Sequence, residues 1–337
     1  MQKIIFLGTD LHGPSSELAS KIVRDLSERI KNSGVLSLEN RKPFSSRENK
    51  IVIPKIFGKN YFRGIIQGIL LPICLIFLRL KYNTIFTFWT AGKKYHYFLF
   101  RLIKFLKYRT FFTVISGYDK DYSALKFCDK IICQSEKMKR HLSEKLPDKE
   151  ITVILPWTNL DVFKPKRKEY DLLIPSVPYD IKDFKERGID KLIDILEKNK
   201  IKAKIIFRSD ETYNYFKKLG LKNAELINGA LSDRKLAEIM SKAGVIPLIY
   251  SSNAPDMPLS AIEGMACGCA IICTEHMGLA DIIKKKKCGI VLESEKGLSN
   301  AINKISNNSS YNKNARKAAE KYFSIKNLNK YLELTRK

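Results

Sequence analysis

The sequence predicts an α/β protein built from two doubly wound domains, and three observations support this fold class. Short apolar runs alternate with helix-patterned stretches along most of the chain, which is typical of parallel sheets with crossover helices. The alternation is interrupted at residues 159–169, where the segment is polar, basic and contains Pro165. The length of 337 residues is sufficient for two domains that each have a core.

Residues 1–160 predict a first Rossmann-like domain. Its first strand is expected at Lys3–Gly8 and an amphipathic helix at Glu17–Lys31, after a loop that contains Gly13. The residues before this strand are too few for the apolar region of a signal peptide, so we expect them to lead directly into the strand. The further strand-like runs are Ile51–Phe57, Thr84–Trp89, Phe111–Ile115, Lys130–Cys133 and Ile151–Leu155.

Residues 161–169 are expected to be a linker, and residues 170–315 a second Rossmann-like domain. Residues 316–337 predict a C-terminal helix that packs back toward the first domain. The strand-like runs are Tyr170–Ser176, Lys204–Arg208, Ala224–Ile227, Val245–Ile249, Ala270–Thr274 and Gly289–Leu292. The helix-patterned stretches between them are Gly188–Lys198, Glu211–Leu219, Ser232–Ala243, Pro258–Cys267 and Ala280–Lys286, with Ser232 as a helix cap.

The charge distribution indicates an anionic partner. The chain has 61 Lys and Arg against 35 Asp and Glu, and residues 49–118 contain twelve Lys or Arg and no acidic residue. An anionic membrane surface and nucleic acid both fit such a basic region, as does a generally lysine-rich composition. The seven cysteines lack paired zinc-type spacing, so free thiols in a reducing cytosol and no metal site are expected.

Two stretches of the first domain bear on a membrane partner. Between Arg63 and Arg79 lie fifteen uncharged residues, whereas a bilayer span needs about twenty, so we expect a buried or interfacial helix. On a helical wheel of Lys93–Arg109, basic residues and aromatic residues share the side opposite an apolar face. The aromatic residues on that basic side are Tyr97, Phe98, Phe100, Phe105 and Tyr108. A membrane headgroup region, single-stranded nucleic acid and a helix packed on two sides remain alternatives.

The stretch Asn253–Ile272 predicts half of a sugar-nucleotide site. A loop with Pro255, Asp256 and Pro258 opens a helix that carries Glu263, and an apolar run follows Gly268 directly. The free N–H groups of a helix N-terminus bind anions well, and the carboxylate lies about a turn and a half into the helix.

From residue 228 to residue 292 the sequence resembles the retaining glycosyltransferases of the GT-B fold, the class called glycosyl transferases group 1. The matching core is D-M-P-L-S-A-I-E-G-M-A-C-G-C-A-I-I at residues 256–272. Glu186-Arg187-Gly188-Ile189-Asp190 stands where the family has E-K-G-x-D. The resemblance implies two Rossmann-like domains that face a central cleft.

The resemblance also implies roles for individual residues of the second domain. Glu263 would bind the donor's ribose, and Arg187 would bind its diphosphate. The family's first Glu falls on Pro255, so the adjacent Asp256 is the candidate catalytic residue. The remaining donor-binding candidates are Lys182, Arg208, Gly229 and the helix start Met257, Pro258, Leu259 and Ser260.

In the first domain, the candidates on the phosphate-loop and acceptor side are His12, Gly13 and Ser116. The expected substrates are a nucleotide-diphosphate sugar and a saccharide or lipid-linked acceptor, with no metal or other cofactor. The protein is then expected to be a retaining glycosyltransferase of the cytoplasm, peripheral at the inner face of the cell membrane, and not a nucleic-acid binder. The alternative is a non-catalytic relative that binds a nucleotide sugar or a partner protein.

Overall fold

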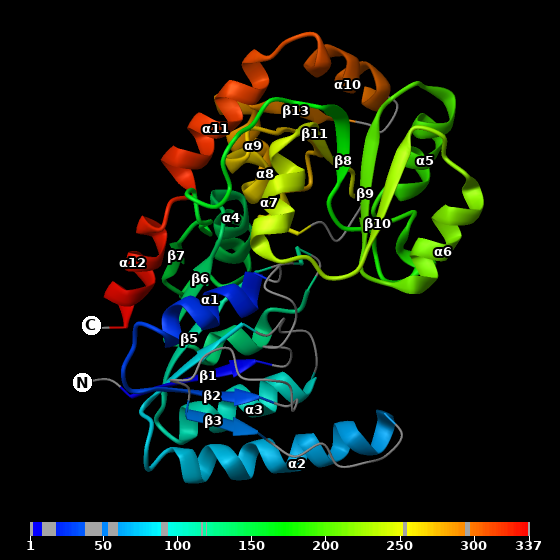
Figure 1. Ribbon diagram of the computed structural model, residues 1–337. Coiled ribbons are helices and arrows are strands. Elements are labelled where there is room, and N and C mark those ends of the chain that lie inside the picture. Colours follow the sequence, from blue (N-terminus) through cyan, green and yellow to red (C-terminus); the bar gives the residue numbers. More distant parts are fainter. Residues whose placement is uncertain are drawn as a thin grey trace. The chain divides into compact units, whose positions relative to one another are not determined.

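The computed structural model describes residues 3–8, 18–37, 49–52, 60–88, 94–115, 117–118, 120–251, 255–293 and 297–335. The chain divides into two compact units (Figure 1). Unit 1 comprises Met1–Leu155 and Asn327–Lys337, and unit 2 comprises Pro156–Lys326. The functional domain boundaries expected at residues 161–169 and 316 stay predictions.

Unit 1 contains a seven-stranded parallel sheet in the order β3-β2-β1-β4-β5-β6-β7. The strands are β1 (Ile4–Gly8), β2 (Ser33–Ser37), β3 (Asn49–Val52), β4 (Thr84–Thr87), β5 (Arg109–Thr113), β6 (Lys130–Cys133) and β7 (Ile151–Val153). β2 was missed in the sequence because S-G-V-L-S has only two large apolar residues, yet it pairs with β1 over its whole length. Of the run expected at Ile51–Phe57, residues 53–57 lie outside the described residues.

Helices cover this sheet and contribute to its core. They are α1 (Leu18–Ser27), α2 (Asn60–Leu78), α3 (Lys94–Phe105), α4 (Glu136–Lys145) and α12 (Lys326–Leu334), with a 3₁₀ turn η1 (Ser123–Phe127). Phe86 of β4 packs against Phe111 of β5 with ring centroids 5.5 Å apart, and against Tyr331 of α12 at 5.9 Å. The aromatic contact of Tyr331 explains why the end of the chain belongs to unit 1.

Helix α3 is packed on two sides, which is one of the three alternatives left open by the sequence. Phe100 is 1% exposed and contacts Phe112, and Tyr97 packs edge-on against Phe127. Tyr108, just after the helix, is also buried. Of the five aromatic residues expected on the basic side, only Phe98 and Phe105 are therefore exposed. The helical wheel could not anticipate this, because the partners of the second face come from distant parts of the chain.

Among the described residues, no helix has both the length and the apolarity that crossing a bilayer requires. The uncharged stretch expected as a buried or interfacial helix lies in α2, which is buried along one side at Leu71 and Leu75.

Unit 2 contains a six-stranded parallel sheet in the order β10-β9-β8-β11-β12-β13. The strands are β8 (Tyr170–Ile174), β9 (Ala203–Phe207), β10 (Ala224–Asn228), β11 (Ala243–Leu248), β12 (Ala270–Thr274) and β13 (Gly289–Leu292). The order reverses between β8 and β11, which is the topological switch point where ligands of doubly wound sheets bind. The prediction of two doubly wound α/β sheets is confirmed.

The helices of unit 2 follow its strands as the sequence predicts. They are α5 (Ile189–Lys198), α6 (Asp210–Leu219), α7 (Asp233–Ser241), α8 (Leu259–Ala266), α9 (Ala280–Lys286), α10 (Leu298–Ser306) and α11 (Ser310–Tyr322), with a 3₁₀ turn η2 (Ile181–Asp183). Ser232 caps α7, because its side-chain oxygen accepts a hydrogen bond from the Lys235 N–H at 3.4 Å. This cap was predicted from the sequence.

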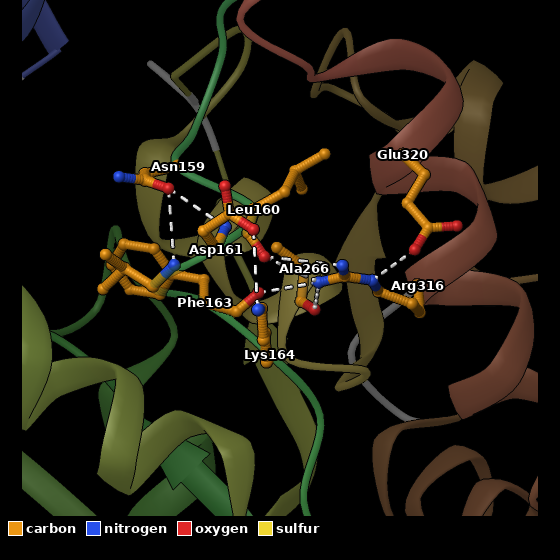
Figure 2. Close-up of polar contacts among 9 residues, drawn as sticks. Asn159, Leu160, Asp161, Phe163, Lys164, Ala266, Arg316 and Glu320 are labelled. Carbon is orange, nitrogen blue, oxygen red and sulfur yellow. Dashed lines mark hydrogen bonds and ion pairs between the residues drawn. The ribbon is translucent and has the colours of Figure 1, made fainter.

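The basic segment 161–169 is held firmly to unit 2. Figure 2 shows Arg316 of α11 between this segment and the C-terminal end of α8. Its guanidinium donates to the carbonyl oxygens of Phe163 at 2.7 Å and Ala266 at 2.8 Å. The Lys168 ammonium donates to the Cys267 carbonyl at 2.9 Å. Carbonyl groups at a helix C-terminus lack intrahelical hydrogen-bond donors, so Arg316 and Lys168 supply donors to the last carbonyl groups of α8.

We expect Arg316→Ala to lower the free energy of unfolding by roughly 2–4 kcal/mol, because it leaves half-buried carbonyl groups without charged donors. The matched control is Glu320→Ala, which removes an ion-pair partner that is 50% exposed and should cost at most about 1 kcal/mol. Urea unfolding of the three proteins measures both values. Equal losses would show that the hydrogen bonds to α8 and the segment contribute little.

Candidate functional site

Helix α8 follows β11 at the switch point of unit 2 and carries one buried carboxylate. Glu263 is the only ionisable residue of α8 and is 4% exposed. Gly264 beside it lets the helix lie directly on β11, since a Cβ there would stand 2.3 Å from the Ile246 Cδ1 atom. A buried Glu in an otherwise apolar helix departs from the usual pattern, and such departures concentrate at functional sites.

The start of α8 offers backbone donors beside this carboxylate. Pro258 caps the helix, and the first hydrogen bond of the helix runs from the Ala261 N–H to the Pro258 carbonyl at 3.1 Å. The N–H groups of Leu259 and Ser260 therefore precede the ladder and point out of the helix end. Pro258 itself has no N–H, so among the predicted residues Met257–Ser260 it acts as the cap and not as a donor.

Asp256 lies in the loop just before α8. It is fully buried, and its carbonyl oxygen accepts a hydrogen bond from the Leu279 N–H at 3.1 Å. This contact fixes the loop to the start of α9 (Ala280–Lys286), which follows β12. The candidate catalytic residue therefore lies beside the start of α9, and its catalytic role stays a prediction.

Arg187 reaches the same end of the sheet from the β8–α5 loop. It is exposed, and its guanidinium lies over the Tyr250 ring at 5.8 Å from the centroid. Tyr250 follows β11, and its carbonyl accepts a hydrogen bond from Thr274 Oγ1 at 2.8 Å. Burial raises the pKa of Tyr250, and the nearby Arg187 offsets part of that increase. The Tyr250 side chain therefore stays uncharged, and the face of its ring contacts the Arg187 guanidinium just before α5.

Gly188 allows the loop between β8 and α5 to lie close to the segment that follows β11. Its φ of +61° is in the left-handed region, and a Cβ there would stand 2.5 Å from the Ile249 carbonyl oxygen. Ser251 N–H also donates to the Glu186 carbonyl at 3.0 Å. Gly188 and Tyr250 position Arg187, and sequence reasoning assigned neither of them a role. The only signal was that Gly188 belongs to the E-R-G-I-D match.

The other predicted cations and the glycine lie apart from this group. Arg208 directly follows β9 and is half-buried. Gly229 follows β10, has a positive φ of +106°, and has open space where a Cβ would lie. Since neighbouring strands are about 4.8 Å apart, Arg208 is roughly 10 Å from the end of β11 along the sheet edge. Lys182 in η2 is exposed and forms an ion pair with Asp180 at 2.6 Å. His12, Gly13 and Ser116 lie outside the described residues.

The described residues contain no group of three or more His, Cys, Asp or Glu arranged to hold a metal ion. All seven cysteines are free thiols, and six of them are buried. Burial raises the pKa of Cys269 to about 11, so this thiol stays protonated at neutral pH. Cys267 and Cys269 therefore act as small apolar side chains at the end of α8.

Two doubly wound parallel sheets are the architecture of the GT-B fold, and the chain is similar to solved structures with this fold. Sucrose-phosphate synthase of Thermosynechococcus elongatus is similar over 100% of this chain and 98% of its own, with a TM-score of 0.78 and 16% identity. Anabaena HepE has been solved in complex with UDP and glucose and with UDP-glucose. It is similar over 99% of both chains, with TM-scores of 0.75 and 0.74 and 14% identity.

Residues 181–322 match the family described as "Glycosyl transferases group 1". An uncharacterized glycosyltransferase of Methanocaldococcus jannaschii is 28% identical over 171 residues. The match covers 49% of this chain and 45% of that protein, so the chain spans about half the length of the curated relative it matches. The resemblance stated from the sequence is confirmed.

Proposed function

We propose that the protein transfers a sugar, with retention of anomeric configuration, from a nucleotide-diphosphate sugar to an acceptor. The observation that carries this proposal is the buried Glu263 in the apolar helix α8, next to the free N–H groups of Leu259 and Ser260. A carboxylate accepts two hydrogen bonds from a ribose diol, and a helix N-terminus stabilises a diphosphate.

Arg187 supplies the positive charge that this leaving group needs. As the bond between sugar and phosphate breaks, negative charge grows on the diphosphate, and a positioned cation with backbone donors lowers the barrier. Arg187 lies at the head of α5, on the other side of the switch point from α8. Arg208, Lys182 and Gly229 are further donor-binding candidates, although they lie apart from Arg187 and α8. This chemistry requires no metal.

The test is a panel of UDP- and GDP-sugars incubated with the purified protein, beginning with UDP-glucose, the molecule bound by the similarly folded HepE. We expect donor-induced thermal stabilisation and slow donor hydrolysis without acceptor for one of them. Absence of both stabilisation and hydrolysis across the panel would contradict the proposal.

A non-catalytic nucleotide-sugar-binding relative is the second candidate. It is favoured by Pro255, which stands at the position of the family's first Glu, and by the complete burial of Asp256. In that case a donor sugar would stabilise the protein without any turnover, and Asp256→Ala would leave the stabilisation unchanged. Asp256→Ala that abolishes hydrolysis while preserving donor binding would support the catalytic role instead.

We also propose a saccharide or lipid-linked acceptor at an anionic membrane, with the protein peripheral at the inner face of the cell membrane and no nucleic acid bound. The acid-free run over residues 49–118 supports this, together with the exposed Arg101, Lys104 and Lys107 on and after α3. Transfer from the best donor to an organic-solvent extract of membranes, compared with a water-soluble saccharide extract, distinguishes the two kinds of acceptor.

A further inference from the structure

Helix α2 carries an apolar face that is exposed in the part of the chain that the structure describes. The exposed fractions are 58% for Ile69, 43% for Ile73, 50% for Ile76, 68% for Phe77 and 89% for Leu80. Spacings of four, three and one residues place the first four side chains on one side of α2, and Leu80 lies in the turn that directly follows the helix. We call these five residues the α2 stripe. Soluble monomers rarely expose a continuous apolar surface of this kind unless it binds something.

The opposite side of α2 is fixed to the core of unit 1. Leu71 and Leu75 are 2% and 0% exposed, and the Tyr108 hydroxyl donates to the Leu75 carbonyl at 2.6 Å. Figure 1 shows α2 beside α3 along the margin of the unit 1 sheet. The exposed stripe is therefore the outer face of a well-anchored helix.

Cationic side chains lie at the C-terminal end of the stripe. Arg79 Nε donates to the Leu106 carbonyl at 2.8 Å, which brings the end of α3 next to the end of α2. Lys81, Lys104 and Lys107 are exposed there, together with Phe105 at 79%. An apolar centre with a cationic margin and no acidic residue from 49 to 118 complements an anionic lipid surface. A second copy of the chain would bring the same positive charges together, which opposes self-association.

We propose that α2 lies in the plane of an anionic bilayer surface, with the α2 stripe and Phe105 inserted among the lipids and Lys81, Lys104 and Lys107 at the headgroups. Residues 69–80 extend over roughly 18 Å, whereas the hydrocarbon core is about 30 Å thick, so the stripe suits insertion parallel to the membrane. The inference depends on the proposed function only for the reason why the protein would bind a membrane. Vesicle binding itself is measured without a nucleotide-sugar donor.

The test is flotation of the full-length protein with vesicles of phosphatidylcholine alone, or with about one third phosphatidylglycerol. We expect binding to the anionic vesicles, and a loss of roughly tenfold or more in Ile76→Gln/Phe77→Gln. The matched control is Tyr215→Gln/Ile325→Gln, which removes two apolar residues of unit 2 that are 37% and 46% exposed and should not change flotation. Lys104→Gln/Lys107→Gln should weaken binding, whereas Lys217→Gln/Lys218→Gln on α6 should not.

Three results would overturn the inference. They are no flotation of the wild-type protein, equal flotation of the Ile76→Gln/Phe77→Gln variant, or a concentration-dependent dimer that this variant loses while flotation stays unchanged. Donor-induced thermal stabilisation of the same proteins tests the transferase proposal separately. Donor binding without flotation overturns the docking surface and the proposed membrane location but not the transfer of a sugar, whereas flotation without any donor effect overturns only the proposed transfer.

Discussion

Replacing Glu263 by glutamine is expected to lower kcat/KM for the nucleotide-sugar donor by roughly a hundredfold or more. The variant keeps the shape of the side chain but would weaken the two proposed charge-assisted hydrogen bonds to the ribose, and such bonds are each worth about 1.5–3 kcal/mol. Because Glu263 is 4% exposed, water cannot easily substitute for the lost contacts. Initial rates of donor hydrolysis and calorimetric donor affinity measure the effect.

The control for this prediction is Glu238→Gln on α7, whose carboxylate is 46% exposed and pairs with Lys235. It removes the same charge from unit 2 and should leave donor affinity within about twofold. If Glu263→Gln binds the donor normally but unfolds at a lower temperature, Glu263 has a structural role in α8 and the donor site lies elsewhere.

Gly188→Ala is expected to reduce the free energy of unfolding by about 2–4 kcal/mol and to weaken donor binding at the same time. The left-handed backbone costs a non-glycine residue roughly 1–2 kcal/mol, and the added Cβ meets the Ile249 carbonyl oxygen, which is held within the sheet end. The loop must then move away from β11 and carry Arg187 with it. Chemical denaturation and donor titration measure the two consequences.

Gly220→Ala separates the steric effect from the backbone effect. Gly220 at the end of α6 has nearly the same φ, +63°, but open space where the Cβ would lie. It should cost about 1 kcal/mol and leave donor binding unchanged. Equal stability losses in the two variants would show that the loop at Gly188 can relax, and that its contact with β11 does not hold Arg187 in place.

The local features of unit 2 were predictable because they are encoded locally. β12, β13 and α9 have the bounds expected from the sequence, and Ser232 forms the cap that its position before an amphipathic run indicates. The helix with Glu263 and the E-R-G-I-D match were also visible as short motifs. Apolar periodicity and capping chemistry operate over a few residues, so the sequence displays them directly.

Errors arose where the decisive contact is distant in the sequence. β2 is held by its pairing with β1, which its own polar composition does not reveal. Phe100 was placed on a basic helix face, yet it is buried against Phe112. The uncharged stretch of α2 was expected to be a buried or interfacial helix, and only tertiary packing decided that Leu71 and Leu75 are covered while the α2 stripe is exposed.

The sequence by itself determined the fold class, the resemblance to a glycosyltransferase family and the presence of one carboxylate in α8, because these depend on motif and periodicity. Only the tertiary structure decided which of the candidate site residues lie close together. The strand order places Arg187 and α8 on opposite sides of one switch point and leaves Arg208 and Gly229 further along the sheet edge. The close approach of Gly188 to Ile249 and the support of Arg187 by Tyr250 likewise arise from strands far apart in the chain, whose neighbourhood no local pattern specifies.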